Sequence, residues 1–170
     1  TALYGCGRNR EGQLGLGDES EKDKFTVVPF LPKGTVAKQV VPGRYHTMIL
    51  AEDGKVFACG NNEDGQLGLG DNDNRNTFTA VELPDNKVIK QVVAGDNHTM
   101  ILAEDGTVFG CGDNNDGRLG LGDNNNRNTF TAVPPLPDGK VAKQVVSGRY
   151  HTMILANDNT VFASGYNLYG

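Results

Sequence analysis

The chain has 170 residues and a net charge of −5, from 16 basic and 21 acidic residues. This balance provides no basic field for a phosphate backbone, so we expect no direct nucleic-acid partner. No apolar run is long enough for a membrane-spanning helix, and no membrane partner is expected either.

The sequence repeats itself along its whole length. The segment Gly-Gln-Leu-Gly-Leu-Gly-Asp occurs at 12–18 and 65–71, and again at 117–123 with Arg118 replacing the glutamine. A fixed period of about 52 residues is the signature of a repeat architecture. The same step separates single residues: His46, His98 and His151, and Gly7, Gly60, Gly112 and Gly165. We divide the chain as one repeat domain, 1–170, with repeat 1 at 8–60, repeat 2 at 61–112, repeat 3 at 113–165, and overlap strands at 1–7 and 166–170.

Each copy of the pattern predicts four short β-strands. In one copy the β-branched run 88–93 and the apolar run 98–103 predict the first two strands. Asp105-Gly106 predicts a hairpin turn, and 107–112 is the returning strand. A fourth strand is expected at 129–133, with equivalents at 25–28 and 77–81.

Four short strands per repeat, with glycine-rich turns and no helical periodicity, predict an all-β fold. We expect β-propeller blades of four antiparallel strands. A solenoid of stacked strands is the alternative, although its repeats are usually shorter than these.

The glycine-rich segment 65–71 does not have the sequence pattern of a phosphate-binding loop. No Lys-Ser/Thr pair follows it and no helical pattern begins there, although phosphate loops need one or the other. We expect its glycines to allow positive φ in tight turns, with Leu67 and Leu69 filling apolar gaps beside them.

The order of these motifs resembles a known repeat. It is Val-Val-x-Gly-x-x-His-Thr-Met-Ile-Leu-Ala, then Asp-Gly-x-Val-Phe-x-Cys-Gly, then the glycine-rich segment. This order resembles the repeat of the regulator of chromosome condensation family. The resemblance implies a β-propeller, usually of about seven blades. We expect an intracellular protein of the cytoplasm or nucleus, because the three cysteines show no pattern for disulfide pairing.

Three copies cannot close such a ring. Together with a first residue other than Met, Thr1, this predicts either a partial propeller belonging to a longer chain or self-association of several copies. The founding member of the family exchanges nucleotide on the small GTPase Ran, and plant photoreceptor relatives rely on tryptophan clusters. This chain has no tryptophan, which excludes the photoreceptor role.

Residues present in every copy are expected to serve the fold. A general base works in one site, so a histidine in each copy is better explained as a turn residue that bonds a neighbouring backbone group. The cysteine position, Cys6, Cys59 and Cys111, fits a small residue packed in a strand, since successive copies lie too far apart for a disulfide. The acidic turns after 71 and 123 lack the closing glutamate of a calcium loop and are expected to form Asp/Asn turns. We expect no metal, no cofactor and no enzyme activity on a small substrate.

Two sets of loop residues differ between copies while their surroundings do not. One precedes each histidine, and the other follows each Cys-Gly pair. Loops of one kind gather on one face of a propeller, where variable loops on a rigid frame commonly bind partners. The alternative is ordinary solvated turns. The predicted partner-binding residues are Arg44, Tyr45, Asp96, Asn97, Arg149, Tyr150, Arg8, Arg10, Glu63, Asp64, Asp113 and Asp116.

The sequence therefore predicts a protein-interaction scaffold. A partner spanning the loops would meet a basic, an acidic and again a basic position, at Arg44, Asp96 and Arg149. The alternative function is nucleotide exchange on a Ran-type small GTPase.

Overall fold

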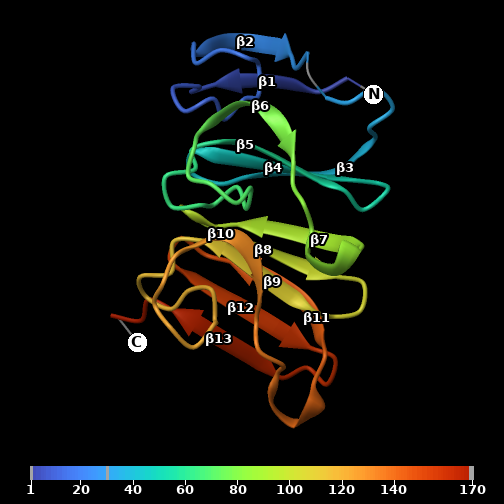
Figure 1. Ribbon diagram of the computed structural model, residues 1–170, viewed down its shortest axis with the longest axis vertical. Coiled ribbons are helices and arrows are strands. Elements are labelled where there is room, and N and C mark those ends of the chain that lie inside the picture. Colours follow the sequence, from blue (N-terminus) through green and yellow to red (C-terminus); the bar gives the residue numbers. More distant parts are fainter. Residues whose placement is uncertain (1, 30, 169–170) are drawn as a thin grey trace.

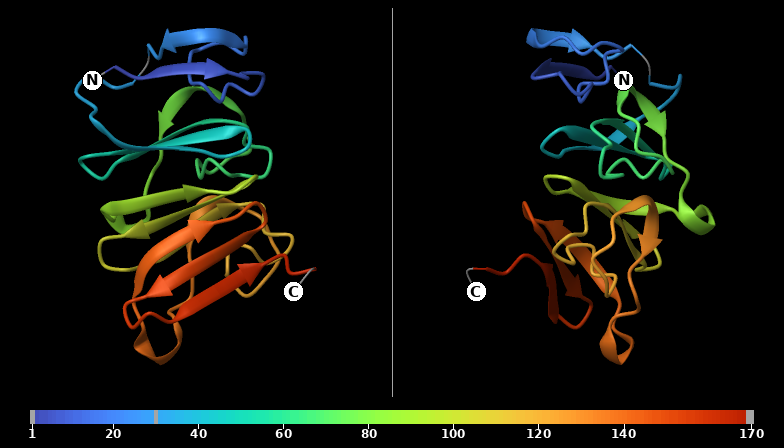
Figure 2. Two further views of the ribbon diagram at one scale, coloured as in Figure 1. Left: turned by 180° about the vertical axis from the view of Figure 1, so that it is seen from behind. Right: turned by 60° about the vertical axis from the view of Figure 1, so that its left-hand side comes forward.

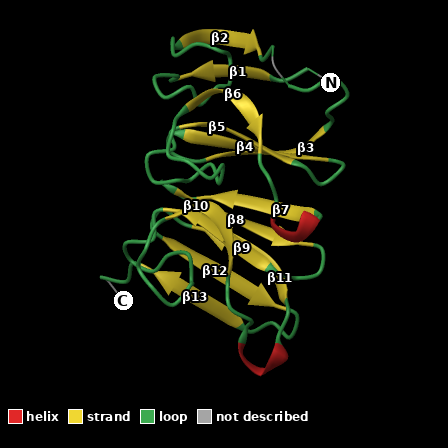
Figure 3. Ribbon diagram, viewed as in Figure 1, coloured by secondary structure: helices red, strands yellow, loops and turns green. Residues whose placement is uncertain are grey.

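The chain folds into antiparallel β-sheets that follow one another along its long axis (Figure 1). This computed structural model describes residues 2–29 and 31–168, so the predicted overlap segment at 166–170 lies partly outside the described residues. Within the described part there are thirteen strands and two short 3-10 turns, Pro84–Asn86 and Pro137–Gly139 (Figure 3). The all-β prediction is confirmed.

Two of the four sheets are complete four-stranded blades. Blade 1 has the order β3-β4-β5-β6 and blade 2 the order β7-β8-β9-β10, each running through the chain by consecutive antiparallel pairs. The strands of blade 1 are Ala37–Pro42, His46–Ala51, Val56–Gly60 and Arg75–Ala80. Those of blade 2 are Ile89–Ala94, His98–Ala103, Val108–Gly112 and Arg127–Ala132.

A partial sheet lies at each end of the row. The N-terminal pair consists of β1 (Tyr4–Gly7) and β2 (Lys22–Val27), which match the third and fourth strands of a blade. The C-terminal sheet consists of β11 (Ala142–Ser147), β12 (His151–Ala156) and β13 (Val161–Gly165), which match the first three. Figure 2 shows these two partial sheets at opposite ends of the molecule.

Tight hairpin turns join the second and third strands of both blades and of the C-terminal sheet. Gly54 and Gly106 take φ values of +81° and +86° there, a conformation that glycine adopts without steric cost. In the C-terminal sheet Asn159 takes this position with φ +69°, as asparagine tolerates better than most residues.

The glycine-rich segment links the third strand of a blade to its fourth and reaches across to the next blade. A Cβ atom built on Gly68 would clash with the Phe130 ring of blade 2, so only glycine fits this close approach. Leu67 is fully buried between blades 1 and 2, as predicted.

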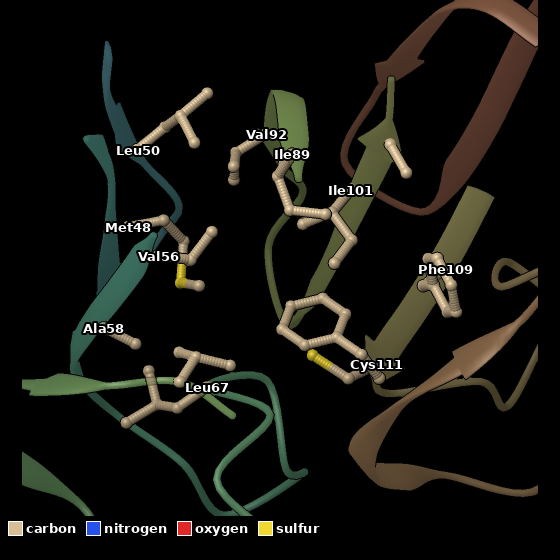
Figure 4. Close-up of a cluster of buried hydrophobic side chains, with 13 residues drawn as sticks. Met48, Leu50, Val56, Ala58, Leu67, Ile89, Val92, Ile101, Phe109 and Cys111 are labelled. Atoms are coloured by element: carbon tan, nitrogen blue, oxygen red, sulfur yellow. The ribbon is translucent and has the colours of Figure 1, made fainter. Parts of the chain in front are cut away.

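The hydrophobic core is divided into layers between neighbouring sheets. Figure 4 shows the layer between blades 1 and 2, where Met48, Val56 and Leu67 face Ile101 and Cys111. Equivalent clusters lie between the N-terminal pair and blade 1 and between blade 2 and the C-terminal sheet. Because each layer needs two sheets, each sheet is stabilised mainly by its neighbours in the row.

Candidate functional site

The repeated histidines connect neighbouring sheets. His46 Nε2 lies 2.9 Å from Thr99 Oγ1 on blade 2, and His98 Nε2 lies 3.2 Å from Thr152 Oγ1 on the C-terminal sheet. Thr99 donates its own hydroxyl hydrogen to the Gln66 carbonyl at 2.7 Å. It therefore accepts the hydrogen from His46, which places the imidazole hydrogen on Nε2. The predicted backbone partner was wrong, because the ring reaches past the turn to a side chain of the next sheet.

These histidines have the wrong pKa for catalysis at neutral pH. Burial lowers the pKa of His46 to about 4 and that of His98 to about 3, because burial penalises the charged imidazolium. The charge of Arg118 lowers the pKa of His98 further, whereas Asp96 acts in the opposite direction on His46. Both rings are neutral hydrogen-bonding groups inside the fold.

The cysteine position is also structural. The thiols of Cys59 and Cys111 each donate to a carbonyl of the glycine-rich segment, of Gln13 and Gln66, at 3.4 Å. Burial raises the pKa of both thiols, which keeps them protonated and unreactive. Ser164 takes the same position in the C-terminal sheet and donates to the carbonyl of Gly117.

Both predicted loop sets lie on one face of the row, which we call the loop face. Backbone hydrogen bonds join the two sets directly, from Asn61 N to Tyr45 O at 2.9 Å and from Asp113 N to Asn97 O at 2.8 Å. The same bond recurs in the C-terminal sheet between Tyr166 and Tyr150 at 3.0 Å. The two complete blades and the C-terminal sheet therefore each present one residue pair before the histidine beside one loop after the third strand.

Arginines and tyrosines form a row along the loop face. The guanidinium groups of Arg8 and Arg44 lie over the ring of Tyr45, at 4.7 and 4.8 Å from its centroid. At the other end, Arg149 lies over Tyr150 at 4.8 Å. These stacks hold the guanidinium planes in place while much of each arginine remains exposed, with 51%, 44% and 59% of the side chain accessible for Arg8, Arg44 and Arg149.

Asp96 joins the two halves of this row. Its Oδ2 atom accepts from Arg44 Nη1 at 3.3 Å and from Arg149 Nε at 2.7 Å. Only 17% of the Asp96 side chain is exposed, and its hydrogen bond and charge raise the pKa of Arg149. The row from Arg8 to Tyr150 thus spans all four sheets, and we name it the Arg–Tyr row.

Acidic residues lie next to the row but are partly committed to contacts inside the protein. Asp64 accepts from the side-chain amides of Asn97 at 3.0 Å and Asn126 at 3.2 Å. Partial burial, and then the charge of Asp113, raise the pKa of Asp64. Asp113 itself is buried and pairs with Arg118 at 2.7 Å. Its carboxylate neutralises a buried arginine, and its predicted role in partner binding stays a prediction.

The remaining predicted residues lie around the edge of the face. Arg10 pairs with Glu21 at 2.9 Å and stays largely exposed, and Glu63 is exposed. Asp116 is an exposed residue whose carboxylate bonds Arg118. Asn97 is half-buried and serves Asp64.

Arg118 is a residue next to the predicted loops that the sequence prediction left out. Its guanidinium is buried, pairs with Asp113 and Asp116, and lies 5.1 Å from the Tyr150 ring centroid. In the equivalent place Gln66 donates to Asn61 Oδ1 at 2.6 Å. Both members of this neutral pair are thus replaced by charged residues in repeat 3. Arg118 was visible as the one substitution in an otherwise identical segment.

The acidic turns are held by protein donors, as the turn prediction expects. Asp71 accepts from the backbone of Asp73 at 3.0 Å and from Arg75 at 2.6 Å. Among residues 2–29 and 31–168, no three His, Cys, Asp or Glu side chains gather closely enough to hold a metal ion. The same residues contain no helix with the length and apolar character needed to cross a membrane.

Known proteins share these repeats over the whole chain. The model of the "Regulator of chromosome condensation (RCC1) repeat" matches residues 2–50, 53–102 and 105–155. The X-linked retinitis pigmentosa GTPase regulator of Homo sapiens is 46% identical over 120 residues, which is 70% of this chain and 12% of the relative. The secretion-regulating guanine nucleotide exchange factor of Bos taurus is 33% identical over 99% of this chain and 36% of the relative.

Solved structures show the same fold. Human WBSCR16 superposes with a TM-score of 0.87 at 24% identity, covering 98% of this chain and 44% of that one. Yeast RCC1 (Prp20), solved bound to Kap60, gives 0.81 at 22% identity, covering 97% and 40%. The chain spans less than half the length of each of these proteins. It belongs to the regulator of chromosome condensation repeat family, and its sheets are blades of that family's β-propeller.

Proposed function

We propose that this chain is a protein-interaction scaffold that binds a protein partner through the Arg–Tyr row. The observation that carries this proposal is the shared bond of Asp96 to Arg44 and Arg149. The shared bond to Asp96 fixes two exposed guanidinium groups in the free protein. Less side-chain entropy is therefore lost when a partner binds, and this preorganisation lowers the free-energy cost of association. Arginine and tyrosine are also the residues that most often dominate binding energy at protein interfaces.

The geometry changes the expected chemistry of the partner. The sequence predicted alternating contacts with a basic partner group at Asp96, but the carboxylate of Asp96 is already bonded to two arginines. The face therefore offers three stacked guanidinium groups, from Arg8, Arg44 and Arg149, and the partner that fits is an acidic protein surface. Such pairing is expected to be salt-sensitive.

A double substitution tests the row. Arg44→Ala with Arg149→Ala should weaken partner capture by about tenfold or more, because interface arginines often contribute more than ~1 kcal/mol each. The measurement compares the proteins retained from a cell extract by the original chain and by the variant. Lys55→Ala is the control, since Lys55 lies in the hairpin turn between β4 and β5 and is a basic residue with 71% of its side chain exposed.

Replacing both arginines with lysine separates charge from geometry. Lysine keeps the charge but cannot stack or present a planar fork, so capture should fall with this variant as well. The proposal is contradicted if the Arg44→Ala, Arg149→Ala variant captures as much partner as the original chain while Lys55→Ala captures less. The binding surface would then lie at the hairpin end of the sheets.

Nucleotide exchange on a small GTPase is the second candidate. It is supported by the similarity of this chain, over 99% of its length, to a protein named as a guanine nucleotide exchange factor. The test loads a Ran-type GTPase with a fluorescent nucleotide and follows its release as this chain is added. If the chain is an exchange factor, nucleotide release should become faster in proportion to the concentration of the chain. The double arginine variant should lose this acceleration. If the rate of nucleotide release is unchanged while the chain still captures partners, the exchange role is excluded and the scaffold role remains.

A further inference from the structure

The linker from β10 to β11 contains the only two adjacent prolines of the sequence. It occupies residues 133–137 and reads Val-Pro-Pro-Leu-Pro. The equivalent linkers read Val-Glu-Leu-Pro at 81–84 and Val-Pro-Phe-Leu-Pro at 28–32, so neither has two prolines in succession. Loops that differ between copies on a rigid frame are places where a specific binding function can lie.

The prolines hold this linker in an extended polyproline II conformation. Their rings fix φ at about −65°, and a residue that precedes a proline is forced towards extended ψ values. Leu136 has φ −62° and ψ +147°, which are polyproline II values. This helix has about three residues per turn, so residues three apart in the sequence lie along the same edge.

The burial of the linker follows this period of three residues. Val133 and Leu136 are half-buried and pack against the core layer between blade 2 and the C-terminal sheet. Pro134, Pro135 and Pro137 are exposed. One edge of the helix therefore anchors the linker to the protein, while the other two edges, both made of proline, face solvent.

Open space lies beside the exposed prolines. A cavity of about 220 Å³ is bordered by Pro134, Pro135 and the hairpin turn between β8 and β9. Its volume exceeds the roughly 150 Å³ that accommodates benzene, so an aromatic side chain can enter it. A cavity bordered by Glu82 and the β4–β5 hairpin occupies the equivalent place between the two complete blades, and Glu82 is exposed there as well. The exposure of this linker position is thus a property of the junction between two neighbouring sheets.

The linker lies at the opposite end of the strands from the loop face. β8 begins at the loop face and ends at the hairpin that borders the cavity, and the linker ends in the 3-10 turn Pro137–Gly139, the lower red turn in Figure 3. The charges around it are paired within the protein, Lys87 with Asp105 at 2.6 Å and Lys140 with Asp158 at 3.2 Å. An apolar partner group therefore fits this surface, whereas an acidic one fits the Arg–Tyr row.

We infer that the linker at 133–137 is a docking segment for a WW domain of a partner protein. WW domains bind polyproline II segments in a groove lined by aromatic side chains, which pack against proline rings. The adjacent rings of Pro134 and Pro135 offer such a groove two neighbouring apolar contacts. SH3 domains also bind proline-rich segments, but their ligands add a basic residue beside the prolines, and the residue next to Pro137 is Asp138.

Titration of a WW domain tests this inference. The probe is an isolated WW domain that binds the free peptide of residues 133–140 in the same assay. This chain has no tryptophan, so the tryptophan fluorescence of the WW domain reports binding without interference. The folded chain should bind at least as tightly as the peptide, because its linker is already held in the bound conformation.

A matched pair of proline variants locates the contact. Pro134→Ala should weaken binding by about tenfold or more, because an apolar ring is removed from the contact. Pro29→Ala is the control, since Pro29 is exposed at the same position of the repeat 1 linker, and its affinity should equal that of the original chain. Thermal unfolding of both variants confirms that the fold is retained.

The salt dependence separates this contact from the Arg–Tyr row. Binding of the WW domain should change little as salt is raised, because the charges around the linker are already paired. The inference is overturned if the folded chain fails to bind a WW domain that binds the peptide. It is also overturned if Pro134→Ala binds as tightly as the original chain, or if Pro29→Ala loses as much affinity as Pro134→Ala.

Discussion

Acidification from pH 7 to pH 4 is expected to lower the free energy of unfolding by several kcal/mol. The cause is the pair of buried histidines, His46 and His98, whose pKa values in the fold are about 4 and about 3 against 6.5 in an unfolded chain. Below pH 6.5 the unfolded chain binds two protons that the folded chain excludes. Stability is therefore complete above pH 6.5 and falls as the pH drops, by ~1.4 kcal/mol per pH unit for each histidine.

Urea unfolding at pH 7, 6, 5 and 4 measures this loss. Carboxylates such as Asp71, whose pKa the Arg75 guanidinium lowers, lose their contribution mainly below pH 4, so the histidines dominate the interval above it. His98→Gln should reduce the slope between pH 6 and pH 4 by about half, because one proton-excluding group is gone. At pH 7 the same variant should be less stable by roughly 1–3 kcal/mol through the lost hydrogen bond to Thr152.

His151→Gln is the matched control for this experiment. His151 occupies the same repeat position but is exposed, so its replacement should leave both the slope and the stability at pH 7 nearly unchanged. A slope that is the same in the original chain and in His98→Gln would contradict the assignment of acid lability to the buried rings.

Replacing Phe130 with alanine is expected to cost about 3–5 kcal/mol of stability. Its ring fills the layer between blades 1 and 2 beside Leu67 and Cys111, and the rigid glycine turn at Gly68 cannot collapse into the space left behind. Phe25→Ala removes the same ring from the same repeat position where it is exposed. Under dilute, monomeric conditions its effect should stay within about 0.5 kcal/mol.

Thermal and urea unfolding of the two variants give this comparison directly. Phe78→Ala should resemble Phe130→Ala, since Phe78 is buried at 7% against Leu16 and Cys59. Similar losses for Phe25 and Phe130 would show that the position matters through strand propensity rather than through packing between sheets.

The strands and their grouping into blades could be predicted because the pattern recurs. Alternation, Asp-Gly turns and proline stops each give a weak signal in one copy, but their recurrence at 25–28, 77–81 and 129–133 locates the fourth strand. Periodicity also predicted that the variable loops lie on one face. The grouping of the strands and the common face of the loops depend only on where a residue lies within its repeat, and this can be read from the sequence.

Contacts between copies could not be predicted in the same way. The bond from His46 to Thr99 and the sharing of Asp96 by two arginines depend on how far one sheet is displaced from the next, which no periodicity specifies. The ion pair of Asp113 with Arg118 could not be predicted for the same reason, because Arg118 lies on the far side of a tight turn. Charged side chains near glycines are ambiguous until the backbone path is known.

Each complete blade takes three strands from one sequence repeat and its fourth from the next, as β6 at Arg75–Ala80 follows the end of repeat 1 at residue 60. A duplication of one period therefore adds one whole blade wherever in the period its two breakpoints fall. Strand order, turn positions and the residues at both ends of the row stay the same after such an event. Chains of this kind can therefore lengthen by unequal recombination without a special boundary between units.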